Sequence, residues 1–228
     1  MKKHFCVFFT VLIILVGCSS IENSESSNDE VRVIGIDYDY SLSNNYESLL
    51  EKSELIVSGN YNELNSKWNM ARNPDDIELD DEEYYTEGLI YNFSIDEILY
   101  SSNVIDETSI LVNLRHFERI DVPHDDGSVE SINYTDPFFI EPVSDQKYVL
   151  FLQYNHNFDH YYAASEPFQF SLENEELVVI SNLFKEDKTN VQKTSKTTVN
   201  GPTFENITDE FSGIKVKELE ELITKVKE

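Results

Sequence analysis

The sequence predicts a mainly β protein, a small curved sheet or barrel of about six strands with a short helix before it and another at the C-terminal end. The chain has 228 residues, of which 40% are hydrophobic and 12% aromatic, which is enough to build one core of ordinary size. Short apolar runs follow one another without intervening helical patterns, which argues against alternating βαβ units. We therefore expect an α+β protein dominated by strands.

The individual elements follow from the spacing of apolar residues. Residues 44–53 (NNYESLLEKS) combine a capping Asn with apolar side chains at helical spacing, and Leu219, Leu222, Ile223 and Val226 line one face of a second predicted helix. Runs with alternating or continuous apolar residues predict the strands, and the last two of these read as a hairpin. The predicted strands cover residues 55–59, 89–99 with a bulge, 109–117, 147–154, 168–172 and 177–180.

Two polar stretches interrupt this pattern. Residues 74–83 (PDDIELDDEE) contain seven acids in ten positions, which predicts a solvated loop. Residues 185–204 are mostly polar and rich in Lys and Thr, and we expect them to form an exposed excursion from a single domain that covers residues 31–228.

The N-terminal end carries a targeting signal. Lys2 and Lys3 precede the run Phe5–Val16 (FCVFFTVLIILV), in which only Thr10 is polar. Twelve residues are too few for a membrane-spanning helix, which needs about 20, so a secretion signal over residues 1–17 fits better. An ordinary cleaved signal peptide and an uncleaved anchor are the alternatives.

The tetrad LVGC at residues 15–18 resembles the bacterial lipobox. This resemblance implies that Cys18 receives an S-diacylglycerol, that the chain is cut just before it, and that the new terminus takes an N-acyl group such as palmitate. It also implies a lipoprotein on the extracytoplasmic face of the cell membrane, and the Asn-, Ile-, Lys- and Tyr-rich composition favours a Gram-positive bacterium. Cys6 would leave with the signal, so the mature chain would have no disulfide.

Residues 18–30 and the charge balance limit the partners. Ser, Asn and acids dominate the segment after Cys18, which predicts a solvated tether. The whole chain has 17 basic and 44 acidic residues and a net charge of -27, which argues against nucleic acid and against direct contact with an anionic membrane. The lipid is then the expected membrane contact, and a cationic protein or a cell-wall component is the expected partner.

The order of elements also resembles a family of folds. A helix, then SELIVSGNY, YNFSIDEILY and KYVLFLQY, is similar to secreted bacterial lipoproteins with OB-like barrels, which are related in shape to netrin-like inhibitor domains. The resemblance covers residues 46–180 and implies an OB-like barrel. It implies no particular activity, because that shape hosts many functions.

One segment, residues 154–162 (YNHNFDHYY), holds the candidate site residues. His156, Asp159 and His160 have an H-x3-H spacing that would bring them to one metal ion if the segment were helical. Its strand-like flanks argue against a helix, and a third imidazole would have to come from His116 or His124. The alternative interpretation is that the histidines serve only packing.

The aromatic residues of the same segment predict a binding surface. Tyr154, Phe158, Tyr161 and Tyr162 alternate with amide and acidic side chains, a mixture that stacks on sugar rings or holds a protein partner. The alternative is that these rings pack into the mouth of the barrel.

Catalytic signatures are absent from the sequence. It contains no G-x-S-x-G, P-loop, G-x-G-x-x-G or HExxH motif, and no cofactor is predicted. We therefore expect a lipid-anchored envelope protein that acts by binding. A metal-assisted envelope hydrolase using His156, Asp159 and His160, or a module that binds cell-wall glycan, are the alternatives.

Overall fold

The computed structural model describes residues 31–36, 38–182, 190–202, 204 and 209–227. The predicted signal, Cys18 and the tether lie outside the described residues. Within that described part, no helix has the length and apolar character needed to cross a membrane.

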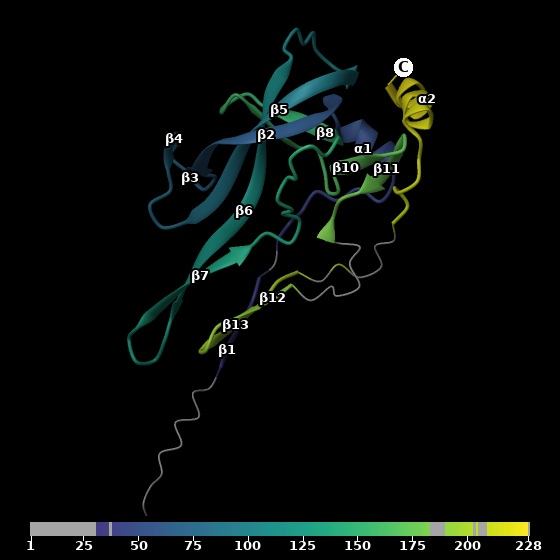
Figure 1. Cartoon of the computed structure of the whole chain (residues 1–228). Coiled ribbons are helices and arrows are strands. Elements are labelled where there is room, and N and C mark those ends of the chain that lie inside the picture. The colour runs from purple at the N-terminus through teal and green to yellow at the C-terminus, as the bar shows by residue number, and fades with distance from the viewer. Residues whose placement is uncertain (1–30, 37, 183–189, 203, 205–208, 228) are drawn as a thin grey trace, which may run out of the picture. The chain divides into compact units, whose positions relative to one another are not determined.

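The predicted mainly β class is confirmed (Figure 1). One large sheet has the strand order β11-β10-β8-β2-β5-β6-β7, and β9 pairs with both β6 and β8. Its strands are β2 (Leu55–Asn69), β5 (Tyr85–Ser101), β6 (Ser109–Pro123), β7 (Val129–Thr135), β8 (Tyr148–Asn155), β9 (His160–Ala163), β10 (Gln169–Glu173) and β11 (Glu176–Val179).

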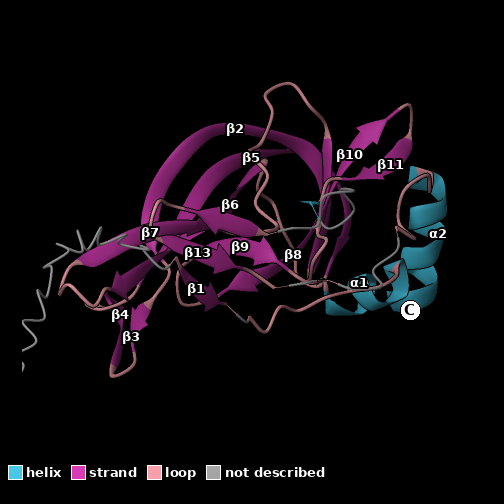
Figure 2. Ribbon diagram, turned by 90° about the horizontal axis from the view of Figure 1, so that it is seen from below, coloured by secondary structure: helices cyan, strands magenta, loops and turns pink. Residues whose placement is uncertain are grey.

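The large sheet curls back on itself. β9 pairs antiparallel with β8 and in parallel with β6 through Val112 and Tyr161, so the pairings pass through β8, β2, β5, β6 and β9 and return to β8. Figure 2 shows the strong bend of β2 and β5 that this closure requires. Four register shifts interrupt the β2–β5 ladder, and such bulges increase the local bend and twist of a strand.

Gly59 lies at one of these shifts for a steric reason. A Cβ atom on Gly59 would lie 1.9 Å from the carbonyl oxygen of Ser94 on β5, so any side chain would push the two strands apart. The core fills the interior beside this contact with fully buried side chains. They include Leu50, Ile56, Phe93, Phe151 and Phe170.

Two helices flank the sheet as predicted. α1 (Tyr46–Lys52) is capped by Asn45, whose Oδ1 accepts a 2.8 Å hydrogen bond from the Ser48 amide, as an N-cap side chain does. α2 (Val216–Lys227) buries Leu219 and Ile223. The two helices contact one another beside the sheet (Figure 2).

Two polar segments differ from the sequence prediction. The expected acidic loop is a small exposed hairpin of β3 (Arg72–Asn73) and β4 (Asp76–Asp80). Arg72 stabilises this hairpin, because its guanidinium group donates a hydrogen bond to the Ile77 carbonyl oxygen and pairs with Asp80 on the opposite strand.

The expected excursion over residues 185–204 holds two strands instead. β12 (Val191–Lys193) and β13 (Thr197–Asn200) pair with each other, and β13 pairs in parallel with β1 (Arg32–Gly35). Val199 is fully buried in a second small core with Val122 and Tyr134. This burial holds β13 against the rest of the domain. Residues 185–189, 203 and the predicted tether are outside the described part.

Candidate functional site

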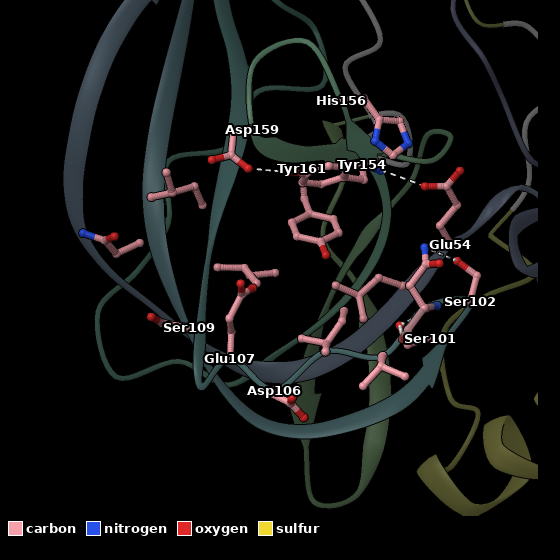
Figure 3. A pocket seen from close by; sticks show the side chains of 17 residues that line it. Glu54, Ser101, Ser102, Asp106, Glu107, Ser109, Tyr154, His156, Asp159 and Tyr161 are labelled. Atoms are coloured by element: carbon pink, nitrogen blue, oxygen red, sulfur yellow. Dashed lines mark hydrogen bonds between the residues drawn. The ribbon is translucent and has the colours of Figure 1, made fainter.

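A cleft in the described part of the chain lies between two connections of the large sheet. Residues 101–107, at the end of β5 and in its connection to β6, form one wall, and residues 154–161 of β8, β9 and their turn form the other. Glu54, just before β2, lies at one end. The cleft has a volume of about 500 Å³, and Figure 3 shows Tyr161 near its centre with labelled acids around it.

The β8–β9 turn places two tyrosines side by side. The Asp159 amide donates a 2.9 Å hydrogen bond to the Asn155 carbonyl, and Asp159 has a φ of 54°, a left-handed conformation that Asp tolerates better than most residues. Its carboxylate accepts a hydrogen bond from the Tyr154 hydroxyl. The rings of Tyr154 and Tyr161 lie 5.0 Å apart between centroids.

Nearby carboxylates help to raise the pKa of both tyrosine hydroxyl groups. The hydrogen bond to Asp159 is the main reason that the pKa of Tyr154 rises to about 12. Burial raises the pKa of Tyr161, and the nearby charges of Glu107, Glu54 and Asp159 raise it further. Both tyrosines therefore remain neutral hydrogen-bond donors at any physiological pH.

The charge of the cleft is strongly negative. Its lining includes Glu54, Asp106, Glu107 and Asp159, and no Lys or Arg lines it within the described residues. Glu54 is held in place by a 3.1 Å hydrogen bond from the Tyr154 amide to its Oε2. Asp106 and Glu107 are exposed. The cleft therefore favours cationic ligands over neutral or anionic ones.

His156 is the one histidine of the cleft lining among the described residues. It is exposed, and its ring lies 4.9 Å from that of Tyr154 in an edge-on arrangement. His156 therefore lies at the margin of the tyrosine pair.

His160 belongs to a different environment. Its side chain is buried, with only 2% of the residue exposed, and its ring lies 5.1 Å from Trp68. The Nδ1 atom is 3.1 Å from the Phe158 carbonyl oxygen. Burial lowers the pKa of His160, so the imidazole is held in its neutral form inside the protein.

The predicted metal ligands are not brought together. Among the described residues, no three His, Cys, Asp or Glu side chains are grouped so that they could hold a metal ion. The chain is in a turn between strands at residues 156–159, so the helical spacing that would align His156 with His160 is not realised. His116 and His124 instead contact Glu87 at 2.7 Å and Glu130 at 3.3 Å.

The four predicted aromatic site residues separate into three places. Tyr154 and Tyr161 line the cleft. Phe158 packs against His160 and Trp68, and the Arg72 guanidinium lies 5.2 Å from its ring centroid. Tyr162 lines another cavity.

Sequence reasoning missed the acids of the opposite wall. Asp106 and Glu107 lie about 50 positions before Tyr161 in the sequence, and Glu54 precedes a different strand. Asp106 and Glu107 are adjacent acids in a short connection between two strong strand patterns, and this pairing is the only sign of them in the sequence. Nothing in the sequence shows that this connection faces residues 154–161.

Comparisons of the chain with protein-family models, with curated proteins and with solved structures find no match.

Proposed function

We propose that this chain is a lipid-anchored protein of the bacterial cell envelope whose domain binds a cationic segment of a protein partner in the acidic cleft. The observation that carries the proposal is the combination of four carboxylates with two tyrosine rings and no lining Lys or Arg in the described residues. The LVGC tetrad supports the anchored location, where such a cleft would face extracytoplasmic partners.

The physical case rests on how Lys and Arg side chains are recognised. Their charged ends pair with carboxylates, and their ammonium or guanidinium groups are attracted to the faces of aromatic rings. Tyr161 offers a ring surrounded by Glu54, Glu107 and Asp159. A volume of about 500 Å³ lies within the range of ligand sites and has room for long basic side chains.

The fixed parts of the cleft reduce the entropic cost of binding. Tyr154 is held by its contacts to Asp159 and Glu54, and neither interaction needs to break when a cation enters. The exposed acids at 106 and 107 supply long-range attraction, which mainly raises the association rate and depends on salt.

The decisive experiment compares two doubly neutralised variants of the full chain purified in detergent. Asp106→Asn combined with Glu107→Gln removes two charges from the cleft, and Asp75→Asn combined with Glu82→Gln removes the same charges from exposed positions that do not line it. We expect an oligolysine peptide to bind the wild type and the control variant, and to bind the cleft variant about tenfold or more weakly, as the loss of two charge pairs predicts.

Equal weakening in both variants would show that binding reflects net charge alone and would contradict the proposal. A neutral peptide of the same length measures any contribution of the peptide backbone.

Capture by isolated peptidoglycan that resists high salt and disappears in Tyr161→Ala would instead support a glycan-binding module.

A further inference from the structure

A second cavity lies on the other side of β9 and shares no lining residue with the acidic cleft. It has a volume of about 150 Å³, close to that of a cavity known to hold benzene. The start of β10, Met70 just after β2, and residues 136 and 138–140 border it together with β6 and β9. Tyr161 and Tyr162 thus line different cavities although they are adjacent in the chain.

Five of the fourteen residues that line this cavity are aromatic. Rings of Tyr40, Phe138, Phe139, Tyr162 and Phe168 line it, and Tyr40 and Phe138 meet edge to face at 4.7 Å between centroids. Such a cage offers ring faces and edges to a small guest. Aromatic cages of this kind are suited to organic ammonium groups.

The cavity also contains a carboxylate whose hydrogen bonds are complete. Asp136 is 6% exposed and accepts hydrogen bonds from the Phe138 amide at 2.8 Å and the Tyr40 hydroxyl at 3.1 Å. The Arg115 Nε atom lies 3.3 Å from the same carboxylate. Asp136 therefore already has hydrogen-bond and ion-pair partners within the protein.

Glu166 is different. Its backbone is fixed, because its amide donates to the Ser41 carbonyl at 2.8 Å and its carbonyl accepts from the Ser43 amide at 2.9 Å. Glu166 lines the cavity, and its carboxyl group has no hydrogen bond or ion pair to any side chain in the described part of the protein. A partly buried carboxyl without a donor is costly, and a ligand that supplies N–H groups and positive charge would remove that cost.

We propose that the aromatic cavity binds a small primary ammonium group, with the carboxylate of Glu166 as its ion-pair partner and the surrounding rings as its walls. The group is either a free small amine or the end of a lysine side chain. An inorganic cation fits less well, because it requires several oxygen ligands and this lining is mostly carbon.

Binding should be coupled to proton release. Burial raises the pKa of Glu166 well above its usual value, and the neighbouring Asp136 raises it further. An incoming ammonium group stabilises the ionised carboxylate. Protein molecules in which Glu166 is protonated therefore release that proton to the buffer when the amine binds. The other ionisable groups facing Glu166 are Asp136, Arg115, Tyr40, Tyr162 and the buried Tyr61 of β2.

The test is calorimetric titration of the full chain in detergent with butylamine, with butanol as the uncharged analogue. We expect saturable butylamine binding that persists in the Asp106→Asn, Glu107→Gln cleft variant, no comparable butanol binding, and a heat that varies with the ionisation enthalpy of the buffer because up to one proton is released. Glu166→Gln should weaken butylamine binding by about tenfold or more, the usual effect of losing a charge-assisted hydrogen bond. Tyr161→Ala, outside this cavity, should leave it unchanged.

A second arm distinguishes the two sources. Nα-acetyl-lysine amide that binds as well as butylamine would indicate a protein lysine, and its failure would indicate a free amine. The absence of butylamine saturation in the folded wild type, or equal binding of butanol, would overturn the proposal even if Glu166→Gln failed to fold. Unchanged butylamine binding in a folded Glu166→Gln variant would overturn it as well.

Discussion

Tyr161 and Tyr162 are neighbours on β9, yet Tyr161 lines the acidic cleft and Tyr162 lines the aromatic cavity. Successive side chains of a strand point to opposite faces, so this short strand separates the two cavities. The arrangement allows each cavity to be altered without touching the lining of the other.

The pair gives the first prediction. Tyr161→Ala removes a ring from the cleft and should weaken oligolysine binding severalfold, because a cation–aromatic contact contributes about 0.5–2 kcal/mol. Tyr162→Ala should leave oligolysine binding unchanged and weaken butylamine binding instead. Titration of both variants with both probes checks this, and a variant that affects both probes equally would contradict the separation.

His160 predicts a pH effect on stability. Burial lowers its pKa in the folded protein, while an unfolded histidine keeps a pKa of about 6.5. As the pH falls through 6.5, the unfolded chain takes up a proton that the folded protein resists, so stability decreases. His160→Gln should lack this part of the pH dependence.

Urea unfolding at pH 7.5 and pH 5.5 measures the effect. The loss of stability between these pH values should be smaller in His160→Gln than in the wild type, by up to about 1 kcal/mol. His156→Gln is the matched control, because His156 is exposed. Identical changes in the His160→Gln variant and the wild type would show that His160 is not held neutral.

Glu166 predicts a pH effect of the opposite sign. Its folded pKa is raised by burial and by Asp136, so the stability it contributes is complete below the unfolded pKa of about 4.3 and is lost as the pH rises toward the folded pKa. Glu166→Gln should therefore gain stability relative to the wild type as pH increases from 5 to 8, by up to about 1.4 kcal/mol per pH unit. Urea unfolding measures this, and the exposed Glu82→Gln is its control.

One added methyl group should lower the unfolding free energy at Gly59 but change it little at Gly35. Gly59→Ala would place Cβ 1.9 Å from the Ser94 carbonyl oxygen, whereas Gly35→Ala meets nothing within 4 Å. We expect Gly59→Ala to lower the unfolding free energy by about 2 kcal/mol or more and Gly35→Ala to change it little. A stable Gly59→Ala variant would mean that β2 and β5 are not in close contact there.

The predicted lipid anchor is tested at Cys18. Cells that express the full chain should release it from the membrane fraction after Cys18→Ala, because this change removes the thiol that would carry the diacylglycerol and with it the acyl chains that anchoring needs. Mass spectrometry of the wild-type terminus should show a diacylated Cys18 as the first residue. An unmodified Cys18, or a mature chain that starts elsewhere, would contradict the lipoprotein interpretation.

Local sequence patterns predicted the helices and the strong strands because the relevant forces are local. The Asn45 cap and the buried Leu49 and Leu50 account for α1. The alternation in residues 168–180 correctly predicted the β10–β11 hairpin. The strands β1, β12 and β13 were missed, because they are stabilised by pairing between distant segments and not by their own propensity.

The candidate site was predicted only in part for the same reason. Of the aromatic residues that the pattern in 154–162 predicts as a binding surface, Tyr154 and Tyr161 line the cleft, and their role in binding stays a prediction. The pattern did not show that Phe158 packs on Trp68. Nor could it show that Glu107 lies near Tyr161, because that proximity depends on how β6 meets β9.

The sequence by itself determined the composition-level properties of this protein, namely its acidic charge, its mainly β class and the expectation of a lipidated N-terminus. These properties follow from residue counts and short-range patterns, which require no knowledge of the fold. Only the tertiary structure decided which acids share a cleft and which aromatic rings surround Glu166. The physical reason is that closure of the sheet through β9 places residues together that are about 50 to 125 positions apart in the chain.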